Sequence, residues 1–177
     1  VSVDQDGFIN EDELLQLVSQ KRPTLFTLIH GHNEIGTVQD AEGIAKKLSQ
    51  LSHVTFHLDA AQSAGKVNID FKNAPIHMLS LSGHKLYAPK GIGALILKDH
   101  SLIRPLFQGG GQEFNLRAGT VNVPGAVGLG FACEWALKHS PIETERLKQL
   151  QKLFIQLVAD ITGIKINGST DRRLPNN

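Results

Sequence analysis

Segments of strand type alternate with segments of helical periodicity along most of this chain, and this alternation limits the fold more than any other feature. Apolar side chains recur at helical spacing in two segments, 11–20 and 40–51. Short apolar runs bounded by turn residues are typical of buried strands. They span residues 24–30, 54–60, 77–83 and 93–97. Strands that alternate with helices favour parallel pairing, so we predict an α/β fold, a mostly parallel sheet with helices on both faces.

The sequence becomes predominantly helical after residue 122. Pro124 suits the first turn of a helix that would reach about Lys138. The run Ser140-Pro141-Ile142-Glu143 has the pattern of a capping box, with proline at the first helical position. Residues 163–168 have the composition of a strand. We therefore expect two helices and then a strand in the last third of the chain.

Composition and charge exclude several classes of protein. The net charge of +1 gives no indication of a direct nucleic-acid partner, and no apolar run approaches the roughly 20 residues that a membrane span needs. The single cysteine, Cys133, cannot form an intrachain disulfide and fits a reducing compartment. The chain lacks an initiator methionine and ends on LPNN, so we expect it to be part of a longer protein.

Polar side chains follow three of the predicted strands, in the segments His30–Gly36, Asp59–Ser63 and Ser82–Lys85. The carboxyl ends of parallel strands meet at one edge of a sheet, where ligands bind in open α/β folds. A lysine beside a carboxylate suits imine chemistry with an aldehyde cofactor, because a desolvated lysine readily becomes a nucleophile. A solvated surface lysine and a helix-capping aspartate would give the same pattern, so spacing alone leaves both interpretations open.

Four longer strings narrow the choice. In chain order they are HNEIGTVQ, FHLDAAQSAGKVNID, MLSLSGHKLYAPKGIGALIL and FQGGGQEFNLRAGTVNVPGAVGLGFACE. Together they resemble the core of the cysteine desulfurases, pyridoxal-phosphate-dependent enzymes of the class V aminotransferase superfamily. The resemblance implies a partial type I pyridoxal-phosphate-dependent transferase fold. Residues 1–121 would be the central part of the cofactor-binding large domain, 122–162 a helical segment leading toward the small domain, and 163–177 the start of that truncated small domain.

The same resemblance assigns roles around the cofactor ring. Lys85 would be the Schiff-base lysine and would later move the α-proton of the substrate. Asp59 would pair with the protonated pyridine nitrogen, and Gln62 would donate a hydrogen bond to the phenolate oxygen. Asn33 would lie near the ring and the bound substrate.

The resemblance also implies a phosphate site shared between two subunits. Ser82 and His84 would bind the phosphate of the cofactor. Thr120 matches a residue that reaches the phosphate in the neighbouring subunit. A homodimer with shared sites would follow from that position.

The implied reaction takes sulfur from L-cysteine, leaves L-alanine, and puts the sulfur on an enzyme cysteine as a persulfide. The sulfur would pass to an acceptor or scaffold protein for iron–sulfur clusters or thiolated tRNA. The implied location is the cytoplasm of a bacterium or the mitochondrial matrix of a eukaryote. Selenocysteine lyase, or another enzyme on the same fold, remains an alternative because it shares these motifs. An alternative of another class is a non-catalytic folded or dimerising module.

Some expected parts of a complete enzyme are not in this sequence. The nucleophilic cysteine of the family lies well downstream of the LPNN segment, and a ring-stacking histidine lies upstream. Cys133, in ACEWAL, falls on a predicted helix among apolar residues and is most simply a core residue. We therefore expect this chain alone not to turn over cysteine. His32 and Ala88 also depart from the family pattern, although neither is a proposed cofactor ligand.

Three other motifs have simpler explanations. Residues 2–13 imitate an EF-hand loop, but serine stands at its first position, and a turn leading into a capped helix explains the pattern better. His30 and His32 could form a metal pair, yet no third ligand stands at a recognisable spacing. The run Gly109-Gly110-Gly111 lacks the spacing and the lysine of a phosphate-binding loop.

Overall fold

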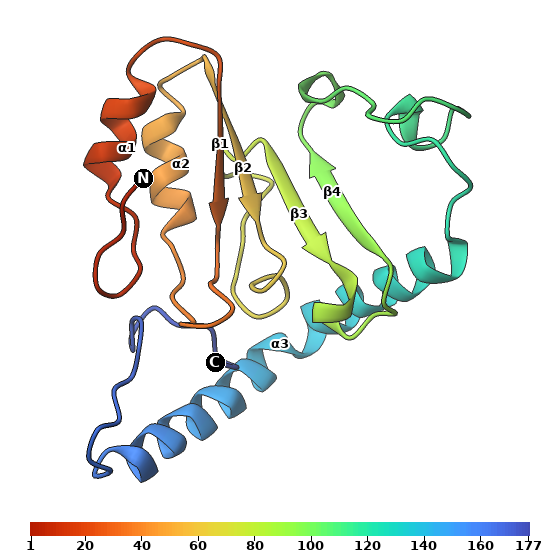
Figure 1. Cartoon of the computed structure of the whole chain (residues 1–177). Helices are drawn as coiled ribbons and strands as arrows, with labels where there is room; N and C mark the ends of the chain where they lie inside the picture. Colours follow the sequence, from red (N-terminus) through yellow and green to blue (C-terminus); the bar gives the residue numbers. More distant parts are fainter.

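A four-stranded sheet forms the centre of the computed structural model, which describes residues 1–177. The strands are β1 (Thr24–Ile29), β2 (Val54–Asp59), β3 (Met78–Ser82) and β4 (Gly93–Leu97), and they lie side by side in that order. The first three are parallel, and β4 pairs antiparallel with β3 (Figure 1). The predicted mostly parallel α/β sheet is confirmed.

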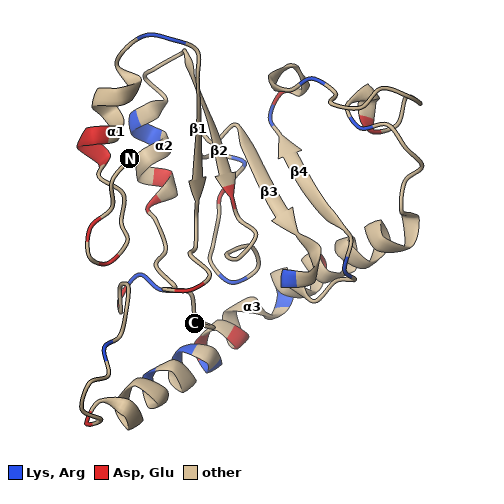
Figure 2. Cartoon of the chain, in the orientation of Figure 1, with Lys and Arg blue, Asp and Glu red and all other residues tan.

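Two short helices cover one face of this sheet. Helix α1 (Glu11–Val18) begins after Asn10, whose side chain accepts a hydrogen bond from the Glu13 amide. Helix α2 (Ala41–Leu48) begins after Asp40, whose side chain accepts from the Gly43 amide. These side-chain caps satisfy amides that lack a partner inside the helix. The acidic first turn of α1 and the basic last turn of α2 match the helix dipoles (Figure 2).

The first ten residues form the turn that the sequence predicts before the first helix. Asp4 Oδ1 accepts hydrogen bonds from the amides of Asp6 and Phe8, and Val3 forms an antiparallel bridge with Ile9. Asn10 then caps α1. The prediction of a turn leading into a capped helix is confirmed.

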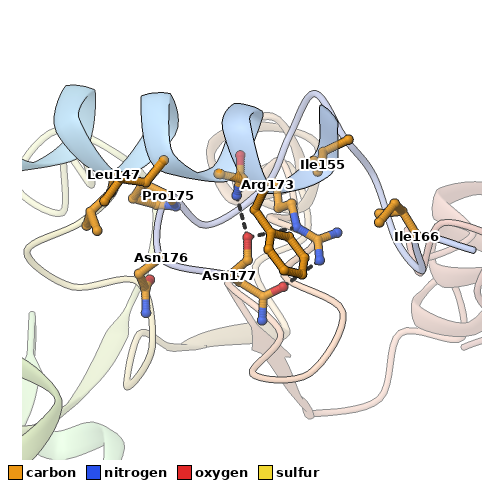
Figure 3. A pocket seen from close by; sticks show the side chains of 10 residues that line it. Leu147, Ile155, Ile166, Arg173, Pro175, Asn176 and Asn177 are labelled. Atoms are coloured by element: carbon orange, nitrogen blue, oxygen red, sulfur yellow. Dashed lines mark hydrogen bonds between the residues drawn. The ribbon is translucent and has the colours of Figure 1, made fainter. Parts of the chain in front are cut away.

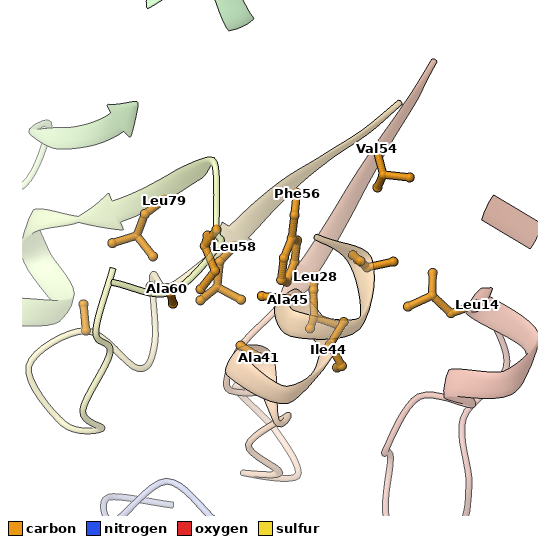
Figure 4. Packing of buried hydrophobic residues seen from close by; sticks show 14 of the residues in the cluster. Leu14, Leu28, Ala41, Ile44, Ala45, Val54, Phe56, Leu58, Ala60 and Leu79 are labelled. Carbon is orange, nitrogen blue, oxygen red and sulfur yellow. The ribbon is translucent and has the colours of Figure 1, made fainter. Parts of the chain in front are cut away.

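The hydrophobic core lies between α1, α2 and the sheet (Figure 4). Phe56 and Leu58 of β2 are completely buried, and Ile44 of α2 lies among them. The alternate residues of β1 point to the other face of the sheet, where Leu25 is 63% exposed and Ile29 is 52% exposed. Helices α1 and α2 therefore cover β1 and β2 on one face, and the predicted helices on the opposite face are not found at these strands, where Leu25 and Ile29 remain exposed.

Helix α3 (Val123–Val158) is continuous, so the prediction of two helices separated at Ser140 is wrong. Pro141 lies inside α3, where a proline removes one main-chain hydrogen bond while the flanking turns continue. The reciprocal contact of a capping box is also not made, because Glu143 pairs with Arg146 instead. The first half of α3 packs on the core through small residues such as Ala132 and Ala136. None of the helices combines the length and apolarity that a membrane span requires.

The last residues fold back beside the loop that follows β1. Arg173 forms a bridge with Thr37, and Leu174 is buried at 2% exposure. Residues 163–168 form no strand, so that prediction is wrong. Gly163 and Gly168 both have positive φ, which breaks extended geometry, and no neighbouring strand offers a partner.

Candidate active site

The ends of β1, β2 and β3 meet at one edge of the sheet, as their parallel order requires. The His30 amide donates to the Asp59 carbonyl at 2.9 Å, and the Ala60 amide donates to the Ser80 carbonyl at 3.0 Å. The three polar segments that follow these strands are therefore neighbours. The sequence-based expectation that these strand ends lie together is confirmed.

Asp59 ends β2 on the face opposite the helices. Its side chain alternates with that of buried Leu58, and it remains partly exposed. Asp59 Oδ1 accepts the Ala61 amide at 2.9 Å, and Ser80 Oγ lies 3.5 Å away on the adjacent strand. These contacts orient the carboxylate at this edge of the sheet, where a charge-assisted hydrogen bond to a cationic group can form.

A short 3₁₀ helix, η1 (Gly83–Leu86), follows β3 and carries Lys85. It ends at Tyr87 in a left-handed conformation, φ +66°. Ser82 Oγ and His84 Nδ1 are 3.1 Å apart, and both side chains are accessible. A hydroxyl and an imidazole at this spacing can bind the same oxyanion.

Lys85 is partly buried and has a second lysine as its neighbour. It lines a small pocket together with Lys66, Trp135 and Glu143. The pKa of Lys66 is lowered, first by burial and then by the nearby charge of Lys85. Lys66 Nζ also donates to the Gln62 carbonyl at 2.8 Å, so it lies beside another predicted site residue.

Lys66 was not among the residues that sequence reasoning selected. The sequence could have indicated Lys66, because this residue follows Gln62 by four residues in the segment after β2. A helical turn brings residues at that spacing together.

Asn33 and Thr120 do not lie at the tips of β2 and β3. Asn33 is exposed in the loop after β1, and its carbonyl accepts a hydrogen bond from the Asn177 side chain at 3.2 Å. Thr120 is exposed near the start of α3, at the end of the long connection that follows β4 (Figure 1). The structure thus brings five of the seven predicted site residues to the tips of β2 and β3, namely Asp59, Gln62, Ser82, His84 and Lys85.

His30 and His32 make separate contacts. His30 is buried, and its Nδ1 lies 2.8 Å from Ser63 Oγ. His32 Nδ1 accepts the amides of Glu34 and Ile35 at 3.2 and 3.4 Å. The structure contains no group of three or more His, Cys, Asp or Glu side chains arranged for a metal. The buried His30–Ser63 pair was missed by sequence reasoning, although strand alternation puts His30 on the same face as buried Leu28.

A larger groove lies elsewhere, between α3 and the C-terminal segment (Figure 3). Leu147, Phe154 and Ile166 give it apolar walls. Arg173 Nη2 donates to Asn177 Oδ1 at 2.6 Å, and the Gln151 side chain donates to the Leu174 carbonyl at 3.0 Å. None of the predicted site residues lines this groove.

Comparison with known proteins shows which family and fold the chain resembles. The family model for aminotransferase class-V matches residues 1–176. The cysteine desulfurase IscS of Dictyoglomus turgidum is 39% identical over 176 residues, which are 99% of this chain and 44% of that protein. A NifS-like protein from Rickettsia africae has a TM-score of 0.93 at 29% identity, covering 99% of this chain and 49% of that one. SspA, solved in complex with cysteine, has a TM-score of 0.68 at 46% identity, covering 76% of this chain and 39% of that one.

The chain spans about half the length, or less, of these proteins, and the matched half contains the parallel strands and the lysine described above. The family match extends over nearly every residue, and the fold agrees with that of the solved neighbours. The chain belongs to the aminotransferase class-V family.

Proposed function

We propose that the gene product containing this chain is a pyridoxal-phosphate-dependent cysteine desulfurase. It would take sulfur from L-cysteine and leave L-alanine and an enzyme persulfide. The observation that carries the proposal is Lys85, which follows β3 at the same sheet edge as the Asp59 carboxylate. Relatives named cysteine desulfurase and a neighbour solved with cysteine support the choice of substrate. The chain spans 44% of such relatives, so activity is proposed for the whole gene product.

The donor set at this edge fits pyridoxal phosphate. Lys85 offers an amine for the aldehyde carbon, and Asp59 offers a carboxylate for the pyridine nitrogen. Gln62 offers an amide for the phenolate oxygen, and Asn33 would lie near the ring. Each polar group of the cofactor therefore has a side chain of complementary chemistry.

The phosphate would bind to Ser82 and His84, whose polar atoms lie 3.1 Å apart at the end of β3. Thr120 would complete this site from the neighbouring subunit of a homodimer. Its exposure, and its distance along the chain from η1, support a role outside its own subunit.

When bound, pyridoxal phosphate supplies an electron-withdrawing ring next to the α-carbon of the substrate. The Asp59 carboxylate would keep the ring nitrogen protonated, because a negative charge at that atom favours the protonated form. Lys85 Nζ would take the proton from the substrate α-carbon as a general base. Partial burial shields Lys85 from water, which favours that role.

The sulfur would be accepted by a cysteine other than Cys133. Cys133 is a free thiol on α3 that packs against the hydrophobic core. A nucleophilic thiol needs exposure and a cationic setting, and Cys133 is only partly exposed beside the apolar core. An acceptor or scaffold protein would then receive the sulfur, in the cytoplasm of a bacterium or the matrix of a mitochondrion.

The division of the chain is part of the same proposal. Residues 1–121 would belong to the cofactor-binding large domain, 122–162 would lead toward the small domain, and 163–177 would begin it. The contact of Arg173 with Thr37 supports a close approach of the two domains at the candidate site.

A spectral titration with pyridoxal phosphate tests the proposal directly, on this chain and on the full-length gene product. We expect a new visible absorbance band, and borohydride reduction followed by peptide mapping should find the adduct on Lys85. The Lys85→Ala variant should show neither, whereas Lys90→Ala, an exposed lysine in the next turn, should keep both. Alanine and sulfide release from L-cysteine, compared with L-selenocysteine, then measures the substrate preference. Absence of the band in folded full-length protein would refute the proposal.

A further inference from the structure

His30 contacts both ends of the segment Asp59–Ser63. It follows β1 directly, and its backbone amide donates to the Asp59 carbonyl at 2.9 Å. Its ring Nδ1 lies 2.8 Å from Ser63 Oγ. His30, at the end of β1, therefore contacts both ends of a segment that begins with Asp59 and includes Gln62.

The contact with Ser63 is fully enclosed by protein. His30 is 5% exposed, and Ser63 is 0% exposed. Burial strengthens a hydrogen bond, and it makes an unpaired donor or acceptor costly. The side-chain bond should therefore hold Ser63 in one place with little exchange for water.

The segment between the two contacts is short and turns sharply. The amides of Ser63 and Ala64 both donate to the Ala60 carbonyl, at 3.2 and 2.9 Å. Asp59 Oδ1 accepts the Ala61 amide inside the same turn. Movement of Ser63 would therefore rotate the turn and with it the carboxylate of Asp59 and the amide of Gln62.

The ring that makes this contact is uncharged at neutral pH. Burial lowers the pKa of His30 to about 4, and the charges of Glu42 and Asp40 oppose that shift only in part. A neutral imidazole has one donor nitrogen and one acceptor nitrogen, so it can bond a hydroxyl in either sense. The His30–Ser63 pair therefore keeps its hydrogen bond at neutral pH, and the neutral ring places no positive charge near the Asp59 carboxylate.

We propose that His30 is a positioning residue. It holds the turn Asp59–Ser63 against the end of β1, and in this way it orients the side chains of Asp59 and Gln62. The proposal rests on the proposed function, because it assigns Asp59 and Gln62 to the cofactor. His30 itself contacts neither cofactor nor substrate in this role.

The test uses the full-length gene product with three substitutions at the contact and one matched control. Ser63→Ala removes the hydroxyl, His30→Leu removes the ring nitrogens, and His30→Asn keeps a polar nitrogen near Nδ1. Ser169→Ala is the control, because Ser169 is also buried and its hydroxyl accepts two amides at a different turn. Each protein is titrated with pyridoxal phosphate, and the amides of 60–64 are followed by hydrogen exchange without cofactor.

We expect Ser63→Ala and His30→Leu to weaken cofactor binding about tenfold and to speed exchange across 60–64. The double variant should be no weaker than the single ones, because both remove the same bond. His30→Asn should recover most of the affinity, and Ser169→Ala should change neither readout. Wild-type affinity and exchange in Ser63→Ala would overturn the proposal.

The two proposals can fail separately. If wild-type protein shows no cofactor band, the desulfurase proposal fails, while exchange at 60–64 still decides whether His30 holds the turn. If His30→Leu does not fold, Ser63→Ala gives the answer, because it leaves the histidine in place and removes a single oxygen. Unchanged exchange there would overturn the positioning role whatever the cofactor does.

Discussion

His30 should also make the fold sensitive to acid. In the unfolded chain a histidine has a pKa of about 6.5. In the folded chain burial lowers the pKa of His30 to about 4. Between these two pH values the unfolded state binds more protons than the folded state, so the free energy of unfolding falls as the pH falls. Above about 6.5 both states hold a neutral ring, and the contribution of this residue is fully present.

The size of the effect follows from the two pKa values. Their difference corresponds to about 3 kcal/mol over the whole range, and to about 2 kcal/mol between pH 7 and pH 5. Burial also lowers the pKa of His57 and His77, so both add to the slope in the same direction. Their contribution cancels when variants at other positions are compared with the wild type.

Urea unfolding of wild type, His30→Asn and His100→Asn at the two pH values measures this contribution. His100 is exposed, so its variant controls for the loss of a histidine as such. We expect wild type and His100→Asn to lose about 2 kcal/mol more than His30→Asn between pH 7 and pH 5. An equal loss in all three proteins would refute the reasoning, because the acid sensitivity would then come from other groups.

Five further substitutions, in three tests, probe the packing by chemical unfolding at neutral pH. Phe56→Ala should cost about 3–5 kcal/mol because the ring is completely buried, whereas Phe131→Ala, at 69% exposure, should cost less than about 1 kcal/mol. Gly130→Ala should stabilise α3 by about 0.5–1 kcal/mol, because an added Cβ meets no atom within 4 Å. A loss of stability would contradict the placement of Gly130. Gly65→Ala should lower the free energy of unfolding more than Gly91→Ala. Both glycines have positive φ, but only at Gly65 would the new Cβ approach another side chain, Leu86 Cδ2, at 2.5 Å. Equal losses would mean that backbone strain alone decides the cost.

The sheet was predictable because its signals are local. The four apolar runs predict the four strands to within a residue or two at each end, and the helical spacing in residues 40–51 predicts α2. The order of polar segments then predicts that Asp59 and Lys85 share one edge, because parallel strands end together. Each of these inferences needs only a few consecutive residues and one rule of chain geometry.

The last third was less predictable because its outcome depends on distant partners. A capping box forms only if Glu143 turns back toward Ser140, and here Glu143 pairs with Arg146 instead. A strand forms only if another strand offers hydrogen bonds, and residues 163–168 have none beside them. The pairing of Ser63 with His30 is likewise a contact across 33 residues of sequence, which no local pattern specifies.

Strand alternation decides on which face the candidate site lies. In β2 the buried positions are Val54, Phe56 and Leu58, so Asp59 must point to the opposite face. A slip of one residue in that alternation would put the carboxylate into the apolar core, where its charge would be costly, and would expose Leu58. The apolar residues of β2 therefore do more than stabilise the sheet, because their spacing keeps Asp59 on the face opposite the helices.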